Sequence, residues 1–209
     1  MAIRTEQMKE ISMDFFRDEV RNGFFIPTAV KQAWAAQLQV LDVIETICRK
    51  HDITYFADWG TMLGTVRHGG YVPWDDDMDI CMKRADYTRF KEAAKTELPK
   101  NFRIHDYEHQ EDHWLFLSRV ANSVHINFEP EHMKQFHNFP YIAGIDIFVL
   151  DYLYKDEQQE KQRCEEVKHI IAVADSIIAG EIAQPVKEAN LIQLEQKYHK
   201  TFNRKLDNR

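Results

Sequence analysis

Apolar side chains recur at three- and four-residue steps in the stretch that runs from residue 34 to residue 50. The positions concerned are Trp34, Leu38, Leu41, Ile44, Ile47 and Cys48. This spacing brings them onto one side of a helix, so it predicts a helix with a single buried stripe. The preceding residues are weakly patterned, with breaks at Asn22-Gly23 and at Pro27, and they favour an N-terminal arm or a short helix.

Short apolar runs alternate with helical patterns over the rest of the chain. The runs predict strands at residues 53–57, 77–82, 102–105, 114–120, 124–128 and 141–149. Helical spacing predicts a short helix after Gly60-Thr61, a helix at 86–98 with Asp86 as its N-cap, and two amphipathic helices at 156–179 and 186–202. The pattern therefore predicts an α/β (α+β) fold, in which helices flank one mixed sheet and a helical C-terminal part follows.

The same pattern divides the chain into three parts. We expect an N-terminal arm at residues 1–33, a core at residues 34–155, and a helical part at residues 156–209 that packs on the core. A chain of 209 residues is long enough for one sizeable core with such an appendage.

The composition is that of a folded protein, with 44% hydrophobic residues and a formal net charge of −7. The negative balance argues against broad nucleic-acid binding, which depends on a basic face, but it allows a small phosphorylated substrate held through a divalent cation. No apolar stretch is long enough for a membrane span, the N-terminus lacks signal-peptide features, and the three cysteines form no CxxC pair. We therefore expect a cytoplasmic protein with reduced thiols.

Four aspartates crowd into five positions directly after Pro73-Trp74, at Asp75, Asp76, Asp77 and Asp79. On an extended strand, alternation would place Asp75, Asp77 and Asp79 on one face. Asp is a poor strand former and neighbouring carboxylates repel each other, so the cluster favours a site for a hard divalent cation, Mg²⁺ or Mn²⁺. The alternative for an isolated acidic run is a solvated turn.

Features outside the acidic run favour the metal site over the solvated turn. Gly60-Thr61 begins a predicted helix, where free backbone N–H groups and the helix dipole attract phosphate. Asp146 stands between two isoleucines in a predicted strand, where a carboxylate is costly without a partner such as a metal. A Gly-Thr turn, an Asp-x-Asp strand and a third strand Asp together match the layout of a nucleotidyltransferase fold.

The segment GTMLGTVRHGGYVPWDDDMDI resembles the signature of the LicD family, and IDIFVLD resembles that family's DIFPLD-like strand. The likeness is dense over residues 58–82 and moderate over residues 143–151. It implies a transferase that takes a CDP-linked donor, moves its phosphocholine or a similar phospho-alcohol group to a sugar hydroxyl of a cell-surface glycan precursor, and releases CMP. Peripheral association with membrane-bound glycan assembly is compatible with this reading.

The resemblance also implies roles for individual residues. Asp77 and Asp79 would be the metal-binding pair and Asp146 the third carboxylate, which could also take the proton of the attacking hydroxyl. Donor phosphate would be contacted by Gly60 and Thr61 and neutralised by Arg67 and His68.

Two arginines have alternative readings. Arg67 is equally well explained as a helix-end cation that serves the dipole. Arg119, in the predicted strand 114–120, could present a cation to phosphate or be an ordinary surface arginine. One position departs from the family pattern, because Trp59 stands where a second glycine often precedes Gly-Thr.

Two other functions stay open at this point. The same fold could transfer a nucleotidyl group from an NTP to a small molecule, which would release pyrophosphate instead of CMP. A non-catalytic nucleotide-binding module is the other alternative, although the carboxylates at 77, 79 and 146 argue against it.

Overall fold

The computed structural model describes residues 11–106, 113, 115–202 and 204. The chain divides into two compact units, Met1–Asp151 and Tyr152–Arg209, each of which is described by itself.

The first unit is built on a five-stranded sheet with the strand order β3-β4-β7-β6-β5. Its strands are β3 (Tyr55–Ala57), β4 (Asp79–Lys83), β5 (Arg103–His105), β6 (Leu117–Ala121) and β7 (Gly144–Leu150). The central pair β4 and β7 is parallel, and every other pairing is antiparallel. This mixed sheet with flanking helices confirms the predicted fold class.

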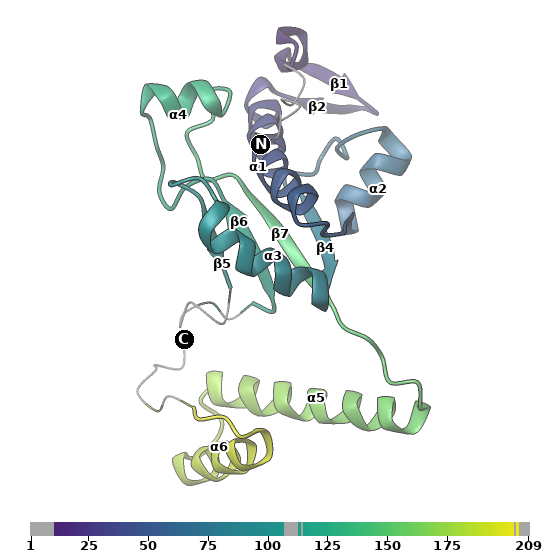
Figure 1. Ribbon diagram of the computed structural model, residues 1–209, viewed down its shortest axis with the longest axis vertical. Coiled ribbons are helices and arrows are strands. Elements are labelled where there is room, and N and C mark those ends of the chain that lie inside the picture. Colours follow the sequence, from purple (N-terminus) through teal and green to yellow (C-terminus); the bar gives the residue numbers. More distant parts are fainter. Residues whose placement is uncertain (1–10, 107–112, 114, 203, 205–209) are drawn as a thin grey trace. The chain divides into compact units, whose positions relative to one another are not determined.

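Two helices, α1 (Thr28–Lys50) and α3 (Arg84–Glu97), cover one face of this sheet (Figure 1). They pack on alternate strand residues such as Ile80, Ile147 and Val120, which are fully or almost fully buried. Because successive strand residues point to opposite faces, the intervening positions face away from α1 and α3. The chemistry-bearing side chains of the sheet lie among those intervening positions.

The N-terminal region contains more structure than the predicted arm. A 3-10 turn, η1 (Met13–Phe16), precedes a hairpin of β1 (Glu19–Arg21) and β2 (Phe24–Ile26). The hairpin turn is the Asn22-Gly23 pair, and both residues hold positive φ, 51° and 78°. This conformation suits the tight turns that match strand twist, for which Asn-Gly is a favoured sequence.

Some predicted boundaries are wrong. Helix α1 begins at Thr28, directly after Pro27, because proline cannot donate to a helix but suits the position before it. Asp86 lies within the first turn of α3, whose N-cap is Lys83.

The strand predicted at 124–128 does not form. There the Ser123 hydroxyl bonds the backbone of His125, and the Asn122 side chain accepts from the Ala143 N–H. Such side-chain bonds compete with the strand ladder. The short helix α4 (Pro130–Gln135) follows this loop.

The second unit contains two helices, α5 (Glu157–Ile178) and α6 (Gln184–Tyr198). Asp156 caps α5 by accepting from the Gln159 N–H, and a salt bridge between Lys197 and Glu166 joins the two helices. Among the described residues, no helix combines the length and the apolar character that crossing a membrane requires.

Candidate active site

A row of charged side chains crosses three neighbouring strands at one end of the sheet. Asp79, the first residue of β4, is paired with Asp146 on β7, and Asp146 is paired in turn with Arg119 on β6. Paired residues of adjacent strands point to the same face. The row therefore lies on the face opposite α1 and α3, and it brings together Asp79, Asp146 and Arg119.

Asp146 and Arg119 form a two-pronged ion pair. The Arg119 Nε lies 2.5 Å from one carboxylate oxygen of Asp146, and an Nη lies 2.7 Å from the other. This bond is the main reason that the pKa of Arg119 is raised. The aliphatic stem of Arg119 crosses Gly144, where an added Cβ would lie 3.0 Å from its Cδ. Gly144 therefore leaves the space that lets the guanidinium reach Asp146.

The three preceding aspartates lie in a loop and not on a strand. Asp75, Asp76 and Asp77 come before β4, which begins at Asp79, so the predicted alternation of Asp75 and Asp77 along a strand is wrong. The reason is that the backbone carbonyls of Asp75 and Asp76 accept hydrogen bonds from side chains of α1 instead of from a neighbouring strand. The loop brings carboxylate oxygens of all three residues within 4.8 Å of one another.

Negative charge and burial together disfavour ionisation in this cluster. The pKa of Asp79, a residue that is 9% exposed, is raised to about 6 by burial and then by the charges of Asp77 and Asp146. Burial also raises the pKa of Asp77, and a hydrogen bond with Asp75 and the surrounding carboxylates add to this effect. A divalent cation would remove this conflict, and oxygen-only ligands suit Mg²⁺ or Mn²⁺. The donor set therefore fits such an ion.

The helix α2 (Trp59–His68) begins beside the carboxylates. Its N-cap is Asp58, and its first helical hydrogen bond runs from the Met62 N–H to the Asp58 carbonyl, so the amides of Gly60 and Thr61 precede the helical series. Those amides carry the positive end of the helix dipole and can receive an anion.

Thr61 and Gly60 also join α2 to the acidic residues. The Thr61 hydroxyl accepts a 2.8 Å hydrogen bond from the backbone N–H of Asp79. A Cβ added to Gly60 would lie 2.2 Å from a carboxylate oxygen of Asp75, so only glycine lets this carboxylate approach the helix. The predicted phosphate turn therefore contacts one residue of the predicted metal pair, Asp79, and lies against the carboxylate of Asp75.

Trp59 holds a backbone conformation that favours glycine. Its φ is +42°, in the left-handed region that a bulky residue rarely adopts. Trp59 is 63% exposed, and its indole lies 5.9 Å from the ring of Phe148. The residue at which the sequence departs from the LicD pattern is thus the residue whose backbone would suit a glycine.

Arg67 and His68 lie in the last turn of α2. Six residues along the helix separate Arg67 from Thr61, an axial rise of roughly 9 Å. Both side chains lie near the ring of Trp74, at 5.9 Å for Arg67 and 6.0 Å for His68. This placement agrees with the helix-end alternative for Arg67, and the contact of Arg67 and His68 with donor phosphate stays a prediction.

Three residues that the sequence analysis did not assign to the site support the acidic loop. The Trp34 Nε1 donates to the Asp75 carbonyl at 2.9 Å, and the Gln37 Nε2 donates to the Asp76 carbonyl at 2.8 Å. The Tyr71 hydroxyl donates to the Gln37 Oε1 at 2.9 Å, and its ring stacks on Trp34. Trp34 and Gln37 are buried on α1. The sequence signal that could have indicated their role is Gln37 itself, a polar residue on the buried side of a helix.

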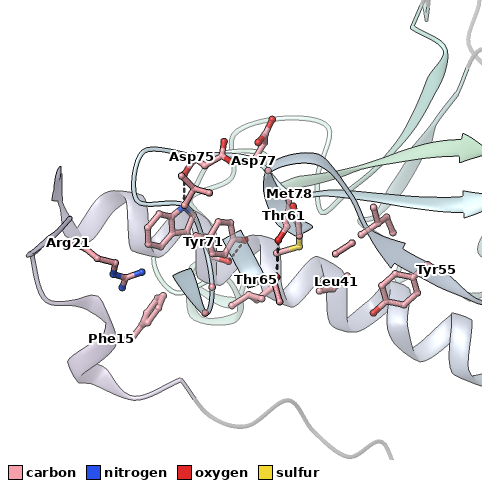
Figure 2. A pocket seen from close by; sticks show the side chains of 18 residues that line it. Phe15, Arg21, Leu41, Tyr55, Thr61, Thr65, Tyr71, Asp75, Asp77 and Met78 are labelled. Atoms are coloured by element: carbon pink, nitrogen blue, oxygen red, sulfur yellow. Dashed lines mark hydrogen bonds between the residues drawn. The ribbon is translucent and has the colours of Figure 1, made fainter. Parts of the chain in front are cut away.

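A pocket of about 450 Å³ lies beneath the acidic loop (Figure 2). Asp75 and Asp77 stand at its edge, and most of its wall is apolar or aromatic: Phe15, Trp34, Leu41, Tyr55, Tyr71 and Met78. Its polar side chains already have partners: Trp34 and Tyr71 bond as described, Thr65 donates to the Thr61 carbonyl, and Arg21 is paired with Glu19. The pocket can therefore hold an apolar or cationic group better than one that is rich in hydroxyls.

Comparison with known proteins gives a consistent result. The family described as LicD/FKTN/FKRP, nucleotidyltransferase domain, matches residues 52–172. A lipopolysaccharide cholinephosphotransferase LicD of Haemophilus influenzae is 35% identical over 71 residues, which cover 34% of this chain and 27% of that protein. An uncharacterized protein of Rickettsia typhi is 37% identical over 66 residues, which cover 32% of this chain and 21% of that protein. The chain thus matches about a quarter of the length of these relatives.

Proposed function

This chain belongs to the LicD/FKTN/FKRP nucleotidyltransferase-domain family, and on that premise we propose that it is a metal-dependent phosphotransferase. It would move phosphocholine or a similar phospho-alcohol from a CDP-linked donor to a sugar hydroxyl of a cell-surface glycan precursor, with release of CMP. The observation that carries the proposal is the grouping of the Asp75–Asp77 loop, the Asp79–Asp146 pair and the N-terminus of α2.

The carboxylates of Asp77, Asp79 and Asp146, with Asp75 and Asp76 beside them, would hold Mg²⁺ or Mn²⁺. When bound, this ion supplies positive charge that offsets the negative charge on the phosphoryl group during transfer. Asp146 would accept the proton of the attacking hydroxyl, and Arg119 would hold the Asp146 carboxylate in place for that role. The amides of Gly60 and Thr61 would bind donor phosphate.

The pocket beneath the acidic loop supports phosphocholine among the possible groups. A trimethylammonium group needs no hydrogen-bond partner and packs well against aromatic faces such as those of the pocket wall. A polyol such as ribitol would bring several hydroxyls into a wall whose polar groups are already bonded. The Haemophilus influenzae relative is named as a cholinephosphotransferase, which agrees with this choice.

The test is the Mg²⁺-dependent release of CMP from CDP-choline, CDP-ribitol and CDP-ethanolamine in the presence of glycan acceptors. We expect turnover of CDP-choline by the unmodified chain and a loss of at least 100-fold, roughly the contribution of one catalytic charge, in Asp77→Asn and Asp79→Asn. Turnover in these variants equal to that of the unmodified chain would contradict the assignment of Asp77 and Asp79 as metal ligands. Pyrophosphate release from an NTP would identify nucleotidyl transfer, and nucleotide binding without any turnover would identify a binding module.

A further inference from the structure

The sheet face that carries the charged row also carries a second, apolar row. One step along the strands from Asp79 and Asp146, the residues Phe56, Cys81, Phe148 and Leu117 occupy paired positions on β3, β4, β7 and β6. They point to the same face as the charged row because they lie two residues from it on the strands that the rows share. The two rows are therefore about 6.7 Å apart along the strands.

Trp59 adds its exposed indole to this row. The indole packs 5.9 Å from Phe148, and Phe56 on the other side of Cys81 is itself 46% exposed. A bulky residue at a φ of +42° is costly for the backbone, and a glycine would relieve that cost. Trp59 thus holds a strained backbone conformation, and its side chain lies on the face of the sheet that also carries the charged row.

We propose that Trp59 and Phe148 form the platform on which the ring of the acceptor sugar lies, an inference that rests on the proposed function. In an in-line phosphoryl transfer, the attacking and leaving oxygens lie on opposite sides of the phosphorus. The group that receives the proton, Asp146 in the proposal, marks the attacking side. Phe148 follows Asp146 by two residues on the same face of β7, so an acceptor whose hydroxyl meets Asp146 extends over Phe148 and Trp59.

The chemistry of the apolar row fits a sugar ring. The C–H face of a pyranose carries no hydrogen-bonding groups and packs flat against the electron-rich face of an aromatic ring. Its hydroxyls then point sideways, toward the half-exposed guanidinium of Arg119 and the carboxylate of Asp58, which interacts with Cys81 of the row. The competing ligand for an aromatic platform is the cytosine base of the donor, and the test separates the two.

The test compares the full chain with Trp59→Gly, Trp59→Phe, Phe148→Ala and the control Phe25→Ala. Trp59→Gly removes the ring while its backbone accepts the observed φ, so thermal unfolding should be unimpaired. Phe25 is a similarly exposed aromatic residue on the β2 strand of the hairpin. Saturation-transfer NMR with methyl glucoside, methyl galactoside and N-acetylglucosamine reports ring contact without any turnover.

We expect saturation transfer to the sugar C–H protons in the unmodified chain, Trp59→Phe and Phe25→Ala, and its loss in Trp59→Gly and Phe148→Ala. In the transfer assay, the acceptor KM should rise about five- to tenfold in Trp59→Gly, as expected for one aromatic contact, while the KM for CDP-choline changes less than twofold. If saturation transfer to the sugar is unchanged in Trp59→Gly, the proposed sugar platform is wrong. It is also wrong if Trp59→Gly lowers the affinity for CMP instead of the contact with the sugar. Absence of CMP release with the sugar signal intact contradicts the proposed function alone.

Discussion

The indole Nε1 of Trp34 donates a 2.9 Å hydrogen bond to the backbone carbonyl of Asp75, which lies 41 residues further along the chain. Gln37, one turn later on α1, does the same for the carbonyl of Asp76. A helix that ends before the family match begins thus holds the loop that carries the proposed metal ligands. The loop itself contains no regular structure, so its geometry depends on these bonds.

Replacing Gln37 by Leu should weaken Mg²⁺ or Mn²⁺ binding more than it weakens the fold. The change leaves the Asp76 carbonyl without its side-chain donor, at a cost of about 1–3 kcal/mol in unfolding free energy. The Tyr71 hydroxyl loses its bond to Gln37 and keeps the Trp34 carbonyl as an acceptor. The matched control is Gln39→Leu, which removes a bond to His137 from the same helix without touching the loop. Titration calorimetry should show a weaker metal affinity in Gln37→Leu and not in Gln39→Leu. Equal affinities in both variants would contradict the role of Gln37 in holding the loop.

Replacing Gly60 by Ala should disturb the site while leaving α2 intact. The new Cβ would lie 2.2 Å from the Asp75 carboxylate, which must move, although alanine itself favours a helix. Gly70→Ala is the control, because its Cβ would meet no atom within 4 Å. We expect metal affinity and CMP release to fall in Gly60→Ala alone, with the melting temperatures of both variants close to that of the unmodified chain.

Metal affinity should rise steeply between about pH 5 and pH 7. The pKa of Asp79 is raised to about 6, and the protonated carboxyl cannot bind a cation, so protons and metal compete in this window. The stability of the metal-free chain runs in the opposite direction. A pKa that is higher in the folded state favours the fold while the group is protonated, and that contribution is lost as pH rises through about 6.

Asp79→Asn should reduce both pH effects, and the raised pKa of Asp77 accounts for what is left of them. At pH 7.5 the variant should be more stable than the unmodified metal-free chain, by roughly 1–2 kcal/mol, because the buried negative charge is gone. Chemical denaturation with EDTA, repeated at pH 5 and pH 7.5, measures this difference. If the difference in unfolding free energy between Asp79→Asn and the unmodified chain is the same at pH 5 and pH 7.5, the pKa of Asp79 is not raised.

Arg119 and Asp146 should be energetically coupled. Arg119→Met leaves the Asp146 carboxylate, 13% exposed, without its guanidinium partner and should destabilise the chain by about 1–3 kcal/mol. In Arg119→Met combined with Asp146→Asn much of that loss should be recovered. A double-mutant cycle by urea unfolding gives the coupling, which we expect to reach about 1 kcal/mol because Arg119 is half exposed. Additive effects would contradict the pairing.

The sequence predicted the parts of the fold that follow from periodic burial. The stripe of α1 and the apolar run of β7 are regular enough to be read directly, and the fold class follows from them. The hairpin at Asn22-Gly23 was missed because its strands are three residues each and show no alternation. The strand predicted at 124–128 was wrong because local side-chain bonds of Asn122 and Ser123 outweigh β-propensity.

Within the site, the motif identified Asp77, Asp79, Asp146, Gly60 and Thr61, and the structure places them around one end of the sheet. The sequence pattern could not predict which residues pair between neighbouring strands. The Arg119–Asp146 pair depends on the register of β6 against β7, which no local spacing encodes. The contacts of Trp34 and Gln37 likewise depend on how α1 lies on the sheet.

The parallel pairing of β4 with β7 also bears on how the chain becomes active. Asp79 and Asp146 come from segments far apart in the sequence, and they meet only when the two central strands pair. Long-range parallel pairing is slow, because the intervening chain must be ordered before the contact forms. Competence to bind the proposed cation should therefore be acquired late in folding. The bound ion should stabilise the folded sheet and slow its unfolding.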